Sequence, residues 1–165
     1  MGYLNLNDVE QKEIVEFLGE LLVGNTSPTV SVEAHKQFRL ADEYESISDY
    51  IRTLSKLLKK MHSSEFPIHA NDESNLHQLH ADVNLYLQGI NRWLMDGGQD
   101  RLPEAVSGSE RINSLFKQAR REHLDRIQKN SVKPLSSLVF VDILQSYRKV
   151  KGHTLNIAEA LSGEK

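Results

Sequence analysis

Three carboxylates near the middle of the chain have the spacing of a cation site. Asp42, Glu45 and Asp49 are separated by three and then four residues, so on an α-helix their side chains lie along one stripe. Carboxylates this close repel one another by roughly a few tenths of a kcal/mol per pair. A hard divalent or trivalent cation would remove that cost, because such ions prefer several oxygen ligands. The alternative is a solvent-exposed face, whose charge Arg52 softens one turn beyond Asp49.

A regular apolar pattern predicts the helix that carries these carboxylates. Apolar residues recur at alternating steps of four and three over three heptads, which is typical of a buried helical seam. The seam consists of Leu40, Tyr44, Ile47, Ile51, Leu54, Leu58 and Met61. The carboxylate stripe lies roughly opposite the seam, so the predicted helix, about residues 32–62, has one buried face and one acidic face.

Four further helices are predicted by the same periodicity, which makes the chain all-α. They cover about residues 7–22, 71–95, 103–129 and 133–162. Asn71 or Asp72 is expected to cap the third helix. The fourth helix starts at Pro103 or at Ser107. The later start is favoured because Ser107 and Glu110 have capping-box spacing and Gly108 inside a helix costs about 1 kcal/mol.

Composition excludes several classes of protein. The chain has 165 residues, a net charge of −3 and no cysteine. It lacks the basic excess typical of a nucleic-acid-binding protein, and disulfides or thiolate chemistry cannot occur. No apolar run approaches the roughly 18 residues of a membrane span, and the N-terminus lacks the pattern of a signal peptide. A cytoplasmic protein, or the cytoplasmic domain of an inner-membrane protein, is expected.

The acidic stretch resembles the signature helix of the PhoU family. In that family an acid is followed four residues later by aspartate, often as Glu-Arg-Ile-Gly-Asp. Here the corresponding residues are Glu45-Ser46-Ile47-Ser48-Asp49, flanked by Arg39 and Tyr50. The end of the last helix resembles the tail of the same signature, in the run Gly152-His153-Thr154-Leu155-Asn156-Ile157-Ala158-Glu159.

The two signature stretches indicate an internal repeat. Aligning His153 with Tyr50 places Gly152 opposite Asp49 and Arg148 opposite Glu45, so the second copy has lost both motif acids. The resemblance implies a PhoU-like pair of antiparallel three-helix bundles, with the first helix of unit one missing. Residues 1–66 would form the partial first unit and residues 67–165 the second. A bundle short of one helix leaves apolar surface exposed.

The resemblance is greatest to the C-terminal, cytoplasmic region of bacterial sodium/phosphate cotransporter-related proteins. It implies a regulatory domain of phosphate uptake that is not an enzyme. A metal ion, iron or zinc, would bind through Glu45 and Asp49, with Asp42 as a helper. The expected partner is the membrane domain of a phosphate transporter, in the same or another chain, or a second copy in a homodimer; nucleic acid is not expected.

Two other hypotheses about function are considered. The chain could be a metal-free helical interaction module that docks on a membrane transporter or self-associates. An enzyme, such as a di-iron carboxylate oxidase, is disfavoured because the chain contains no Glu-x-x-His motif, no phosphate-binding loop and no nucleophile elbow. His77 and His80 share a helix face but lack a third metal ligand on the same stripe.

Overall fold

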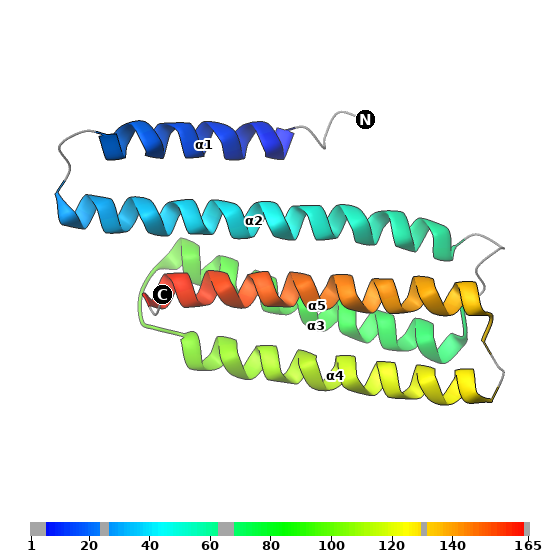
Figure 1. Ribbon diagram of the computed structural model, residues 1–165. Coiled ribbons are helices and arrows are strands. Elements are labelled where there is room, and N and C mark those ends of the chain that lie inside the picture. Colours follow the sequence, from blue (N-terminus) through cyan, green and yellow to red (C-terminus); the bar gives the residue numbers. More distant parts are fainter. Residues whose placement is uncertain (1–5, 24–26, 63–67, 130–131, 164–165) are drawn as a thin grey trace.

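The computed structural model describes residues 6–23, 27–62, 68–129 and 132–163, and all of its regular structure is α-helical. The five helices are α1 (Leu6–Val23), α2 (Pro28–Met61), α3 (Ala70–Asp96), α4 (Leu102–Gln128) and α5 (Pro134–Ser162). They run side by side as long rods (Figure 1). The prediction of an all-α chain is therefore confirmed for the described residues. No described helix combines the length and apolar character needed to cross a bilayer.

The helix ends explain where each rod begins. Pro28 occupies the first turn of α2, and the hydroxyl of Ser27 accepts a hydrogen bond from the Val30 amide at 3.4 Å. At α3 the cap is His69, whose Nδ1 accepts from the Asn71 amide at 3.2 Å. The expectation that Asn71 or Asp72 would cap this helix is wrong, because both lie inside it.

The fourth helix begins next to the earlier of its two predicted starts, Pro103, and the favoured later start at Ser107 is wrong. It starts at Leu102, whose amide donates to the side chain of Asp100 at 3.0 Å, so Ser107 is not its cap. Gly108 therefore lies inside the helix. A Cβ atom added there would lie 3.0 Å from the ring of Tyr86. The packing of Tyr86 on this glycine brings α3 and α4 together and explains why a poor helix former is placed there.

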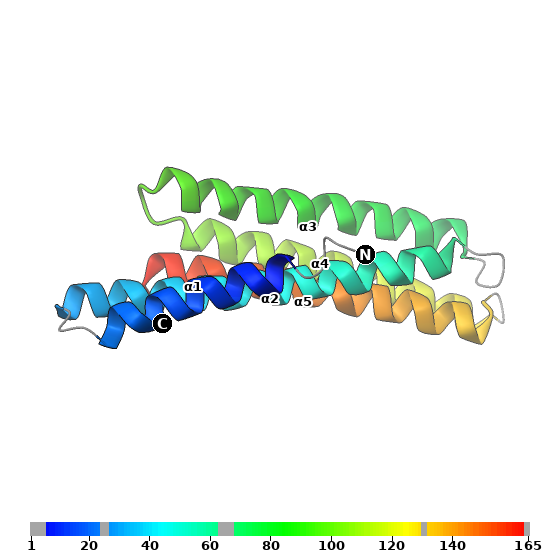
Figure 2. The ribbon, with the colours of Figure 1, turned by 90° about the horizontal axis from the view of Figure 1, so that it is seen from above.

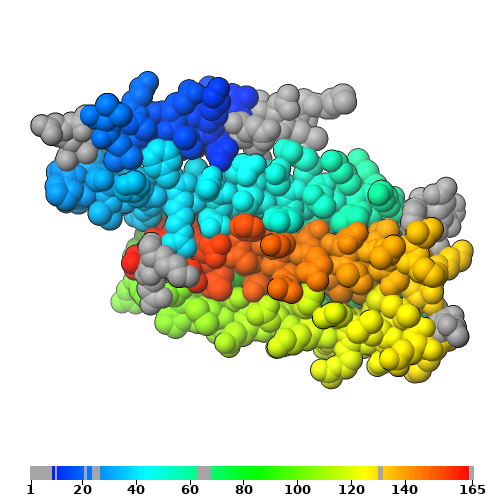
Figure 3. Space-filling model, viewed as in Figure 1, coloured from blue at the N-terminus to red at the C-terminus, as the bar shows by residue number. Residues whose placement is uncertain are grey.

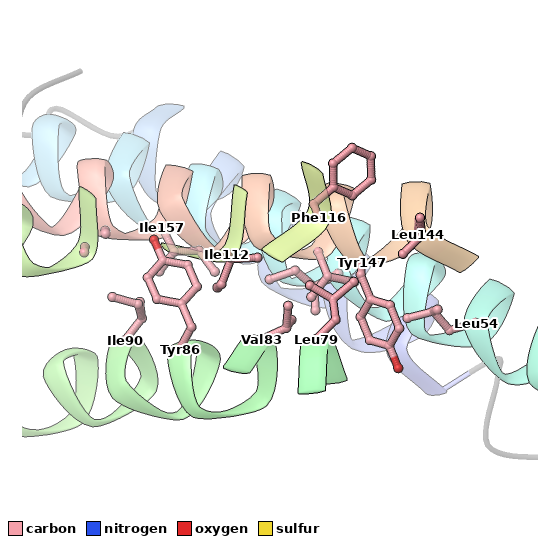
Figure 4. Close-up of a cluster of buried hydrophobic side chains, with 14 of the residues drawn as sticks. Leu54, Leu79, Val83, Tyr86, Ile90, Ile112, Phe116, Leu144, Tyr147 and Ile157 are labelled. Atoms are coloured by element: carbon pink, nitrogen blue, oxygen red, sulfur yellow. The ribbon is translucent and has the colours of Figure 1, made fainter. Parts of the chain in front are cut away.

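The helices are joined by one hydrophobic core. Helices α3, α4 and α5 pack against one another as a three-helix bundle, α2 packs along α5, and α1 packs along α2. The core is centred on α5 and includes Leu40, Ile47 and Leu54 of α2; Figure 4 shows Leu54 beside Tyr147 of α5. The most deeply buried large apolar side chains of the core are Leu79, Ile112, Phe140, Ile143, Leu144 and Ile157. Burying each contributes about 1.5–3 kcal/mol, so this core dominates the stability of the fold.

The first helix is the least supported element. Among the described helices, α1 packs on α2 alone. Figure 2 shows α1 lying along α2, with α3 set to one side of both, and in Figure 3 α1 forms the outermost layer of the molecule. The described helices thus form a helical bundle of three helices plus an α1–α2 pair, with the pair attached through α2 and α5.

Candidate functional site

The acidic stripe lies on the side of α2 that faces away from α5, as its spacing predicted, but α1 packs across part of it. Asp42 is exposed, and its carboxylate accepts a hydrogen bond of 3.1 Å from the side-chain amide of Gln11 on α1. Glu45 is half-buried and lines a hollow between α1 and α2. Asp49 is exposed and forms an ion pair of 3.0 Å with Arg52.

These contacts make the stripe a poor match to a metal centre. In the described part of the chain, no three His, Asp or Glu side chains converge as a ligand set would. Asp42 and Asp49 have protein partners within hydrogen-bonding distance. A cation at the stripe would have to displace Gln11 and Arg52. His77 and His80, which share a face of α3, also have different partners. Nδ1 of His80 lies 3.0 Å from the hydroxyl of Tyr147, and Nε2 of His77 lies 3.9 Å from the carboxylate of Glu73.

The residues of the two signature stretches meet instead at the α2–α5 interface. Glu43 accepts hydrogen bonds from Nδ1 of His153 at 2.7 Å and from the side-chain amide of Asn156 at 3.0 Å. The ring of His153 stacks on Tyr50, with ring centroids 5.5 Å apart. An ionised carboxylate can only accept, so the hydrogen of this bond lies on Nδ1 of His153.

A second set of contacts extends this interface. The guanidinium of Arg39 donates to the backbone oxygen of Asn156 at 3.3 Å and lies 3.5 Å from the carboxylate of Glu159. Sequence reasoning picked out Arg39 and Tyr50 but missed Glu43, which lies outside the acidic stripe. The sequence pattern could have indicated Glu43, because this residue lies next to the apolar seam, on the face where a partner helix must pack.

A buried polar cluster at one end of the three-helix bundle was also missed. Asp72 on α3 and His123 on α4 are each 1% exposed, and their Oδ2 and Nδ1 atoms lie 2.9 Å apart. Nε2 of His123 lies 2.8 Å from the hydroxyl of Ser137 on α5, and Arg126 forms an ion pair with the other oxygen of Asp72. We call Asp72, His123, Arg126 and Ser137 the polar clasp, because they link all three helices.

The clasp has a signal in the sequence. Asp72 precedes Leu76, Leu79 and Val83 at seam spacing, and His123 continues the buried series Ile112, Phe116, Ala119. A polar residue at a seam position needs a partner, since burying it unpaired costs about 1–3 kcal/mol. When two such polar residues lie at the same end of neighbouring helices, each is therefore the expected hydrogen-bond partner of the other.

The clasp has the order of groups found in serine hydrolases, where aspartate orients histidine and histidine activates serine. Such a serine must also face a substrate cleft and donors for the oxyanion. In this chain the ring of His123 is buried against Phe140, with centroids 4.3 Å apart, and Asp72 is shared with Arg126. These contacts favour a structural role for the clasp.

Comparison of the chain with protein-family models, curated proteins and solved structures finds no match to any of the three. The described residues thus define the class of protein only: an all-α protein in which the stretches around Tyr50 and His153 pack on each other.

Proposed function

We propose that the chain is a PhoU-like regulatory module of phosphate uptake that acts by docking rather than by catalysis. Its partner would be the membrane domain of a phosphate transporter on the cytoplasmic side of the membrane. The observation that carries the proposal is the pairing of the two signature helices, α2 and α5. Residues picked out by the resemblance, Arg39 and Tyr50 on one helix and His153, Asn156 and Glu159 on the other, contact each other across this interface.

The register of this pairing supports an internal duplication. Tyr50 and His153 occupy equivalent positions in the two copies, and their rings stack on each other. Helices α2 and α5 run in opposite directions (Figure 1). Equivalent residues of two antiparallel helices meet where a two-fold axis relates the helices, because each element then contacts its own counterpart. The contact therefore fits two copies of one helical unit related by an approximate two-fold axis.

Of the two versions of this module, the one without a metal is favoured by the contacts of the stripe. We expect the purified chain, after incubation with iron, zinc or manganese and desalting, to retain far less than one equivalent of metal. The reason is that Asp42 and Asp49 already have protein partners and do not converge with Glu45. Elemental analysis provides the measurement. Stoichiometric metal that disappears in the Glu45→Ala/Asp49→Ala variant would contradict this prediction and establish the stripe as a metal site.

The regulatory role is tested by sodium-dependent phosphate uptake. The chain is co-expressed in bacteria with the membrane domain of a sodium/phosphate cotransporter, and with an unrelated sodium-coupled amino-acid transporter as the control. We expect the chain to change the rate of phosphate uptake and to co-purify with the phosphate transporter, while amino-acid uptake stays the same. Equal phosphate uptake with and without the chain would contradict the proposal.

A further inference from the structure

Helices α2 and α3 leave a long groove between them. Both pack against α5, but within the described residues they do not pack closely on each other. A hydrogen bond of 2.8 Å from the hydroxyl of Tyr44 to the side chain of Asn91 crosses the gap. Below it, Tyr147 and Val150 of α5 form the floor. Helix α2 forms the wall of the groove opposite α3, and α1 extends this wall outward with Ile14.

The groove has the length of a helix. Two adjoining hollows follow α2 beside α3, from Ala41 past Ile51 to Leu58. A third hollow, between α1 and α2, shares Ile14 with the first and continues it as far as Gln37. The central hollow alone has a volume of about 440 Å³. At 1.5 Å per helical residue, the distance from Gln37 to Leu58 is about 32 Å, which matches an α-helix of about 20 residues.

Apolar side chains are exposed along this groove. Ile51 belongs to the seam that the sequence predicted to be buried, yet it is 46% exposed. Ile14 and Phe17 on α1 are 45% and 63% exposed and line the same hollows. Continuous apolar surface of this kind marks a binding site for another element. A helix with one apolar stripe is the element that fits a straight groove between two helices.

The charges beside the groove define the partner further. The described side chains of α1 include three glutamates and a single lysine, namely Glu13, Glu16, Glu20 and Lys12. Glu13 and Glu45 line the hollows next to α1. The α3 side presents neutral amides and an imidazole, from Asn84, Asn91 and His80. Electrostatic complementarity therefore requires positive charge on the edge of the partner that lies next to α1.

We propose that the groove receives an amphipathic α-helix of about 20 residues from a partner protein, with an apolar stripe facing Ile51 and a basic edge facing α1. This inference rests on the proposed docking role and names the element that docks. A second copy bound through the same face would add two more carboxylates, its own Glu13 and Glu45, to this acidic surface, and these carboxylates repel one another. The basic partner helix avoids this repulsion.

The test measures fluorescence anisotropy with labelled synthetic helical peptides of 20 residues. One peptide has leucines at helical spacing and lysines along one edge; the second has glutamates in place of the lysines; the third is a scramble of the first. We expect the basic peptide to bind at least about tenfold more tightly than either of the others. Its advantage over the acidic peptide should shrink as salt is raised, because salt screens the charges.

Two variants and one control test whether the peptide binds in the groove. Ile51→Gln should weaken the basic peptide about fivefold or more, and Glu13→Lys should reduce the preference for basic over acidic peptide. Both positions are exposed, so the fold is preserved. The control is Leu138→Gln, a similar change at a 63% exposed site of α5 outside the hollows, which should leave binding unchanged.

Three results would overturn the inference: equal binding of all three peptides, unchanged binding by Ile51→Gln, or a dimer in sedimentation that Ile51→Gln dissociates, which would assign the groove to a second copy. The peptide assay contains no transporter. Peptide binding without an effect on phosphate uptake would therefore reject the role in phosphate uptake and support the groove as a helix-binding site. An effect on uptake without peptide binding would support the role in phosphate uptake and reject the groove as a helix-binding site.

Discussion

Replacing Asp72 with alanine is expected to lower the free energy of unfolding by about 3–5 kcal/mol, the typical cost of breaking a buried ion pair from one side. The carboxylate is 1% exposed and is the common partner of His123 and Arg126. Its removal leaves the Arg126 guanidinium, whose side chain is 12% exposed, without its counterion, and removes the hydrogen bond that orients His123. A partly buried guanidinium that has lost its counterion is costly, because little water surrounds it.

Urea unfolding followed by circular dichroism measures this loss. The matched control is Glu73→Ala, the next residue of α3, whose exposed side chain should change stability by less than about 0.5 kcal/mol. An effect of Asp72→Ala below about 1 kcal/mol would show that the clasp does not hold the bundle together. Ser137→Ala should cost less, about 1 kcal/mol, because it removes one hydrogen bond and no charge.

Replacing Glu43 with alanine is the second large effect and is expected to cost about 1.5–3 kcal/mol. The side chain is 15% exposed and receives hydrogen bonds from both His153 and Asn156, so a single substitution breaks the polar centre of the α2–α5 interface. Hydrogen bonds to a charged group are stronger than neutral ones, and the partners left behind are partly buried. The proposed function predicts this result because it assigns the interface to paired signature helices.

A double-mutant cycle separates this pairing from general destabilisation. Glu43→Ala, His153→Ala and the double variant should show a coupling energy of at least about 0.5 kcal/mol, as residues in direct contact do. Asp42→Ala, one position away, removes an exposed carboxylate that contacts α1 and should have little effect. Additive effects of the Glu43 and His153 substitutions would mean that the observed hydrogen bond contributes nothing to the stability of the interface.

Much of the helical framework could be predicted because helix formation follows local periodicity. The seam of α2 is an example: Leu40, Ile47 and Leu54, spaced by seven residues, are buried as expected. The end of α5 is another, since Gly163 terminates it with a positive φ of 79°. The start of α4 could not be predicted from capping spacing, because the contact of Gly108 with Tyr86 comes from another helix.

The sequence by itself determined that the chain is all-α, which helix carries the acidic stripe, and that the stripe faces away from the buried seam. These features depend on residues three or four apart in the chain. Only the tertiary structure decided which side chains pair: Asp72 with His123, Glu43 with His153, and Asp42 with Gln11. It also left Ile51 exposed beside an open groove. The physical reason is that periodicity specifies which face of a helix is buried, whereas the partner on that face depends on how separate helices pack.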